Sequence, residues 1–155
     1  MQELIDYGVD FDQHEVDGEQ VIRLGREGGH SVRRILHSRD TTGREIEKKL
    51  LAAARADPKI TLFEHHYAID LITTSKLGLA TENRCVGIYA LDEKEGEVVN
   101  FRSDRVVLAT GGSGKVYLYT SNPDVATGDG VAMAWRAGVE VANMEFIQFH
   151  PTVLY

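Results

Sequence analysis

The chain has 155 residues, 43% of them hydrophobic, and its 17 basic and 24 acidic side chains leave a net charge of −7. This length and composition predict one globular domain with a single core. Because the chain has no basic surplus, no run of roughly 18 to 20 apolar residues and no signal peptide, we expect neither nucleic acid nor a membrane as a partner, and no export.

The first part of the chain combines a weakly patterned segment with one clear helix. Residues 1–30 are polar and acidic between a few apolar side chains, so we expect a loop with little structure of its own. Further along, apolar side chains recur with helical spacing until Pro58. Thr42 and Glu45 match a capping box, which predicts a helix over residues 42–56.

Short β-branched and aromatic runs follow this helix. They predict strands over residues 60–64, 67–74, 85–91, 97–102 and 105–109. Charged turns separate the later strands, which indicates an antiparallel β-meander. The run Val106 to Ala109 is continuously apolar, as expected of a strand covered on both faces of a sheet. It leads into Thr110-Gly111-Gly112, and open α/β sheets bind their ligands at this end of a strand.

A second helix is predicted over residues 130–137, ended by Gly138. Together with the strands it predicts an α/β fold, which becomes α+β if the piece is isolated. The lone cysteine, Cys85, has no second sulfur for an intrachain disulfide or a zinc site. Such cysteine usage is typical of a reducing cytoplasm.

Two glycine-rich segments match nucleotide-binding motifs only in part. A Walker A loop ending at Gly114-Lys115 would need a glycine at Ala109 and a hydroxyl at Val116. The dinucleotide fingerprint also fails, because Gly128-Asp129-Gly130 has Met133 where its third glycine would stand. We therefore expect no nucleoside triphosphate site, and the pyrophosphate of any dinucleotide would be held by residues outside this chain.

Each candidate site residue also has a purely structural interpretation. Thr110-Gly111-Gly112 forms either a plain tight turn or a place where backbone amides approach a cofactor. Asp129 is by default a helix N-cap, and this role is compatible with accepting a hydrogen bond from a ribityl or ribose hydroxyl. Glu27 is either a solvated loop charge or a carboxylate held by its flanking glycines, and His150 is either structural or directed toward a ligand. Four other histidines show no metal-ligand spacing: His30, His37, His65 and His66.

Several of these segments occur in the same order in one family of flavoproteins. They are Val106-Val107-Leu108-Ala109-Thr110-Gly111-Gly112, Asn122-Pro123, Thr127-Gly128-Asp129-Gly130, Arg136-Ala137-Gly138, Glu145-Phe146 and Gln148-Phe149-His150-Pro151-Thr152. In this order they resemble the succinate dehydrogenase, fumarate reductase and L-aspartate oxidase flavoproteins. The segments Arg26-Glu27-Gly28-Gly29-His30-Ser31, Thr42-Gly43-Arg44-Glu45 and Thr152-Val153-Leu154-Tyr155 resemble the L-aspartate oxidase branch in particular.

The resemblance implies an FAD enzyme that takes a hydride from C2 of L-aspartate to give iminoaspartate, on the de novo route to NAD. Oxygen or fumarate would reoxidise the flavin. By the same resemblance, Asp129 contacts FAD, and Thr110, Gly111 and Gly112 line the cofactor. Ala68 offers backbone groups to the adenine.

The resemblance also implies three substrate contacts. Gln148 and His150 would hold a substrate carboxylate, and Glu27 would orient the substrate ammonium. A carboxylate about 3 Å from an ammonium forms a charge-assisted hydrogen bond. Succinate has no ammonium group, so it cannot form this hydrogen bond.

Parts of the family's catalytic machinery have no counterpart in this sequence. They are the glycine-rich first βαβ unit, the catalytic arginine and the residues that clamp the flavin ring. The resemblance divides the chain into a partial Rossmann-like FAD-binding domain with an inserted β-meander, residues 1–145, and the start of a substrate-capping domain, residues 146–155. We expect no catalytic residue and no metal ligand in the chain, and no turnover from it alone.

Three alternatives stay open on the sequence. The first is a succinate dehydrogenase or fumarate reductase flavoprotein. The second is a noncatalytic α+β interaction module that keeps the look of the family without its cofactor. The third is a piece whose uncovered sheet edges and apolar faces associate with copies of itself.

Overall fold

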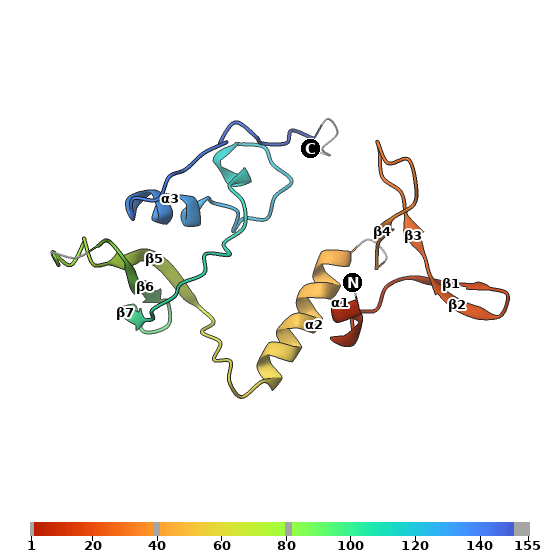
Figure 1. Ribbon diagram of the computed structural model, residues 1–155, viewed down its shortest axis with the longest axis horizontal. Helices are drawn as coiled ribbons and strands as arrows, with labels where there is room; N and C mark the ends of the chain where they lie inside the picture. Colours follow the sequence, from red (N-terminus) through yellow and green to blue (C-terminus); the bar gives the residue numbers. More distant parts are fainter. Residues whose placement is uncertain (1, 39–40, 80–81, 151–155) are drawn as a thin grey trace. The chain divides into compact units, whose positions relative to one another are not determined.

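The computed structural model describes residues 2–38, 41–79 and 82–150 and divides the chain into two compact units, residues 1–63 and 64–155 (Figure 1). Buried hydrophobic side chains occur in both units, and no helix or strand lies between residues 57 and 65 to join them. Among the described residues, no helix is both long and apolar enough to cross a membrane.

The start of the first unit is more ordered than its sequence suggested. A short helix, α1 (Gln2–Asp6), precedes an antiparallel hairpin of β1 (Gln13–Val16) and β2 (Glu19–Ile22). Asp17 and Gly18 turn this hairpin with φ values of 53° and 86°. Two-residue hairpin turns favour Asp-Gly for this reason, so the dipeptide was the signal that the loop prediction overlooked.

Two further elements complete the first unit. The strands β3 (Leu24–Gly25) and β4 (Ile35–Leu36) pair antiparallel around the loop that carries Glu27. The helix α2 (Thr42–Ala56) follows, and its bounds confirm the predicted helix.

The predicted capping box of α2 is wrong. The N-cap is Thr41, without a side-chain cap, and the helix starts with Glu45 N donating to Thr41 O at 3.0 Å. The hydroxyl of Thr42 instead accepts from Ser38 N at 3.0 Å. The hydroxyl that would cap the helix is thus used to hold the preceding turn.

The second unit is built on the predicted meander. β5 (His66–Thr73), β6 (Cys85–Asp92) and β7 (Glu97–Arg102) form an antiparallel sheet in that order. The strand predicted over residues 60–64 is absent, and the segment is exposed and outside the sheet. A short apolar run becomes a strand only where another strand pairs with it, and none of the described strands does so here.

The predicted buried strand over residues 105–109 is also absent, and Val107 is 87% exposed. A strand covered on both faces needs parallel neighbours and covering helices. Every strand pair in the described residues is antiparallel, so these neighbours are missing. The mixed α and β composition is confirmed, in the α+β form expected of an isolated piece.

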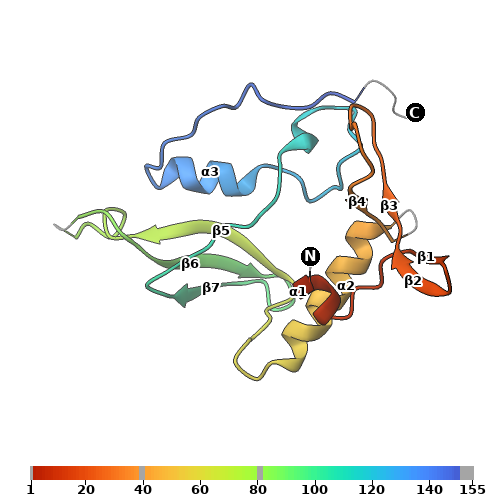
Figure 2. The ribbon, with the colours of Figure 1, turned by 45° about the vertical axis from the view of Figure 1, so that its right-hand side comes forward.

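The chain then reaches its last elements, the 3-10 helix η1 (Gly114–Val116) and the helix α3 (Asp129–Arg136). α3 matches the predicted second helix and ends before Gly138, whose φ is 87°. Met133 anchors the helix with only 1% of its surface exposed. Figure 2 shows α3 lying alongside β5.

Candidate functional site

The glycine-rich segments of the second unit pack closely on each other. A Cβ added at Gly130 would collide with the side chain of Thr110, and one at Gly128 would lie 2.9 Å from Ser113 Cβ. Real Cβ atoms do not approach this closely. Glycine at these positions therefore lets the 110–113 loop rest directly on the start of α3.

Gly111 and Gly112 differ from these packing glycines. Nothing in the described structure lies within 4 Å of a Cβ built at either one. Gly111 has a φ of 73°, which by itself explains glycine there. Gly112 has neither a positive φ nor a close neighbour, so the packing of the chain gives no reason for its missing Cβ. Open space beside a backbone amide fits the close approach of a ligand.

Asp129 is not the N-cap that its sequence position suggested. Gly128 takes that position in the left-handed region, at φ 80° and ψ 15°, and no side chain caps the helix. The Asp129 carboxylate accepts instead from Tyr67 Oη at 2.9 Å and from Thr127 Oγ1, both at Oδ2. The hydrogen bond from Thr127, followed by that from Tyr67, lowers the pKa of Asp129. The side chain is therefore an anionic acceptor at neutral pH.

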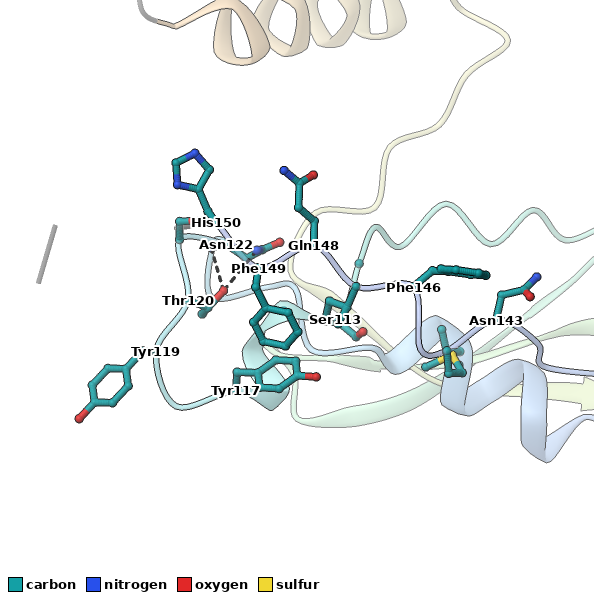
Figure 3. Close-up of a pocket in the computed structure, with 16 residues that line it drawn as sticks. Ser113, Tyr117, Tyr119, Thr120, Asn122, Asn143, Phe146, Gln148, Phe149 and His150 are labelled. Atoms are coloured by element: carbon teal, nitrogen blue, oxygen red, sulfur yellow. Dashed lines mark hydrogen bonds between the residues drawn. The ribbon is translucent and has the colours of Figure 1, made fainter. Parts of the chain in front are cut away.

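A cavity of about 440 Å³ lies beside the 112–114 turn. Gly112, Gln148 and His150 all line it. Its aromatic wall contains Tyr117 and Phe149, whose ring centroids are 5.2 Å apart at an interplanar angle of 78°. Figure 3 shows Gln148 and His150 pointing to one side of their extended segment and Phe149 to the other. An amide and an imidazole are thus presented together, and both groups can donate to a carboxylate.

The remaining predicted site residues lie in two places. Ala68 is in β5, opposite Ala90, and directly follows the residue that bonds Asp129. Glu27 belongs to the first unit, in an exposed loop where its carbonyl accepts from His30 N at 3.2 Å. Gly29 turns this loop with a φ of 81°.

Two of the four histidines without metal-ligand spacing have structural partners. His37 Nδ1 lies 2.9 Å from Asp12 Oδ2, and His66 Nδ1 lies 2.9 Å from Glu64 O. No group of three His, Cys, Asp or Glu side chains in the described residues could hold a metal ion.

Sequence reasoning missed the residues that connect α3 to β5. Tyr67 is 62 positions from Asp129, and no spacing rule links a strand tyrosine to a distant helix. At the other end of the helix, Arg136 donates from Nη2 to Ile69 O at 3.0 Å and lies 3.3 Å, through Nε, from Asp70 Oδ1. The spacing of β5 gave no sign of these contacts.

The pKa of Asp70 leads to a testable prediction about stability. Burial raises its pKa, but the hydrogen bonds from Lys76 and Leu71, with the charges of Lys76 and Arg136, outweigh burial and lower the pKa below its ordinary value. A carboxylate with a lowered folded-state pKa stabilises the protein above its unfolded pKa, and this contribution is lost as pH falls through the folded pKa.

We therefore expect Asp70→Asn to cost about 1 kcal/mol at neutral pH and to flatten the fall in stability toward acid. Urea unfolding of the full-length protein at several pH values measures this effect. The control is Asp124→Asn, which removes the same charge from a side chain that is 94% exposed and pairs with Lys115 at 2.8 Å. Equal losses in the two variants would contradict the role of Asp70.

A glycine turn resting on a helix start, an anionic acceptor on that helix and a cavity with polar and aromatic walls define a piece of a cofactor-binding domain. The chain belongs to the family described as FAD binding domain, whose match covers residues 1–155. FAD, the predicted cofactor, is thereby confirmed.

Relatives of known name agree with this family. L-aspartate oxidase 1 of Ralstonia nicotianae is 58% identical over 152 residues, which are 98% of this chain and 28% of that protein. The chloroplastic L-aspartate oxidase of Arabidopsis thaliana is 54% identical over 154 residues, 99% of this chain and 23% of that protein. The predicted resemblance to this branch is confirmed, and the chain spans about a quarter of the length of these relatives.

Solved structures of the wider family share the fold. The Mycobacterium smegmatis Sdh1 complex matches 97% of this chain and 26% of its own, with a TM-score of 0.79 and 35% identity. A variant of the Escherichia coli quinol fumarate reductase matches 88% of this chain and 22% of its own, with a TM-score of 0.76 and 30% identity.

Proposed function

We propose that the full-length protein oxidises L-aspartate to iminoaspartate with FAD, on the de novo route to NAD. One observation carries the proposal: Gly112, Gln148 and His150 line one cavity, next to the helix that bears Asp129. The names of the relatives that are 50–58% identical to the chain support the same activity.

The cofactor contacts belong to the 110–112 turn and to Asp129. Gly111 and Gly112 leave open space beside their amides, so a planar or phosphate-bearing group can approach the backbone. The Asp129 carboxylate accepts a hydrogen bond from a hydroxyl of the cofactor, and Ala68 presents backbone groups to the adenine. When bound, FAD supplies the acceptor for the hydride.

The substrate contacts divide between the two ends of a diacid amine. Gln148 and His150 point to the same side of their segment and together donate to one carboxylate (Figure 3). Glu27 pairs with the ammonium, and this contact selects aspartate over succinate. The catalytic arginine of the family stays assigned to a segment outside this chain.

The fold of succinate dehydrogenase and fumarate reductase supports the runner-up activity. Sdh1 is 35% identical to the chain, against 58% for the Ralstonia L-aspartate oxidase. The loop with Glu27 decides between them, because only an amino acid substrate has a cation for its carboxylate.

The test is anaerobic addition of L-aspartate to the purified full-length protein. We expect the flavin absorbance to bleach with aspartate and to return with oxygen or fumarate. Bleaching by succinate in place of aspartate would establish the runner-up. A protein that purifies colourless and gives no heat with FAD in titration calorimetry would be the noncatalytic module. The 155-residue chain alone should give no turnover, because groups from several segments must act together.

The chain by itself is expected to associate. Large apolar side chains are exposed on it, among them Leu118 at 86%, Phe146 at 81% and Val125 at 79%. Such surfaces bury themselves in contacts between copies. Sedimentation velocity over a range of concentrations should show growing assemblies, whereas a monomer throughout would contradict this expectation.

The proposal also includes a cytoplasmic location, because the free thiol of Cys85 fits a reducing compartment.

A further inference from the structure

We propose that Tyr67 is a positioning residue for Asp129, and that a bulge in β5 allows this strand to hold both ends of α3. The inference rests on the proposed function, in which Asp129 contacts FAD. It adds a residue that acts on the cofactor only through Asp129.

The strand register shows how Tyr67 and Asp70 come to face the same side. In a regular strand, residues three apart point to opposite faces of the sheet. In β5, however, Tyr67 pairs with Leu91 and Asp70 pairs with Tyr89, so one extra residue lies between Ala68 and Asp70. Leu91 and Tyr89 are two apart on β6 and share a face. Their partners Tyr67 and Asp70 therefore share a face as well, as a bulge requires.

The two contacts on β5 lie closer together than the two on α3. The bulge places Tyr67 and Asp70 opposite residues that are two apart on β6, which corresponds to about 7 Å, whereas the seven steps from Asp129 to Arg136 rise about 10.5 Å, and the long arginine side chain spans the difference. Tyr67 Oη reaches Asp129 at the first residue of the helix, 2.9 Å away. Asp70 and the carbonyl of Ile69 reach Arg136 at the last residue, at 3.3 Å and 3.0 Å. The helix is thus fixed at both ends by one strand.

The contact with Tyr67 also orients the carboxylate. Tyr67 and Thr127 both donate to Oδ2 of Asp129. Two donors from different directions on one oxygen restrict rotation of the carboxylate. In the described part of the chain, Oδ1 has no hydrogen-bond partner, so it is the oxygen available to a cofactor hydroxyl. The lowered pKa of Asp129 agrees with this arrangement, because both donors favour its ionised form.

A double-mutant cycle on the full-length apoprotein tests the role of Tyr67, with the dissociation constant of FAD as the readout. We expect Tyr67→Phe to weaken FAD binding about tenfold and Asp129→Asn to weaken it more. If Tyr67 acts through Asp129, the double variant binds FAD no more weakly than Asp129→Asn alone. The control Tyr89→Phe removes the same hydroxyl from the neighbouring strand and should leave the affinity unchanged.

A pH profile separates positioning from a general loss of packing. FAD binding that needs ionised Asp129 weakens as pH falls through the pKa of that carboxyl. Tyr67→Phe removes a donor and raises this pKa, so the acid limb of FAD affinity should move to higher pH. A variant that only loosens the sheet would lower the affinity at every pH without moving the limb.

The outcomes distinguish the inference from its premise. If Asp129→Asn weakens FAD binding while Tyr67→Phe behaves as Tyr89→Phe, the positioning role is overturned and the cofactor contact stands. Additive losses in the double variant would also overturn that role. If Asp129→Asn leaves FAD affinity unchanged, the cofactor contact of Asp129 is wrong and the inference falls with it. Far-UV circular dichroism checks folding, which Tyr67→Phe should preserve because Tyr67 is 50% exposed.

Discussion

Glu27→Gln in the full-length protein should lower kcat/KM for L-aspartate about 100-fold while fumarate reduction continues nearly unchanged. The variant keeps the shape of the side chain and removes its charge. A hydrogen bond from an ammonium to a carboxylate contributes up to about 3 kcal/mol, and 100-fold corresponds to about 2.7 kcal/mol of transition-state stabilisation. Fumarate and succinate have no ammonium, so the same substitution removes no interaction with either of them.

The structure makes Glu27 a clean position for this test. It is exposed in its loop, and its backbone carbonyl, not its side chain, accepts the hydrogen bond from His30 N. The substitution should therefore leave the fold of the first unit intact. Glu15→Gln, on an exposed position of β1, is the matched control and should change neither activity. Parallel losses with aspartate and fumarate would show that Glu27 supports the site as a whole and does not select the amino group.

Gly112→Ala should weaken FAD binding by about 10- to 100-fold and leave the free energy of unfolding of the apoprotein unchanged. Apart from its chain neighbours, the added methyl meets nothing within 4 Å among the described residues, and Gly112 has no positive φ that alanine would resist. Only a ligand lying against the backbone would meet it. Fluorescence titration with FAD and urea unfolding of the apoprotein measure the two quantities.

Two other glycines provide the comparison for Gly112. Gly43→Ala also adds its methyl to open space, at the start of α2, and should change neither FAD affinity nor folding adversely. Gly111→Ala should destabilise the apoprotein itself by about 1 kcal/mol, because its φ of 73° is unfavourable for alanine. If Gly112→Ala binds FAD as well as Gly43→Ala does, the 110–112 turn does not face the cofactor.

Local patterns predicted the elements that depend on local physics. The helix over residues 42–56 and the one before Gly138 follow from apolar spacing and from a glycine stop, and both agree with α2 and α3. The strands of the meander were likewise visible, because each pairs with the next strand along the chain.

The failures share a different cause. The runs at residues 60–64 and 105–109 look like strands, but the described residues offer them no neighbouring strand. The hairpin turned by Asp17 and Gly18 was missed because its acidic composition outweighed its turn signal. Strand formation depends on pairing, which composition does not report.

The sequence by itself predicted the family and the cofactor, which the family match confirms, and it proposed the residues that would contact the cofactor and the substrate. Only the tertiary structure decided that Tyr67 bonds Asp129 and that Arg136 bonds the strand three residues further on. These contacts join segments more than sixty residues apart and depend on one extra residue in β5. Because side chains alternate along a strand, a shift of one residue reverses which face each one occupies, and that register is set by pairing with β6.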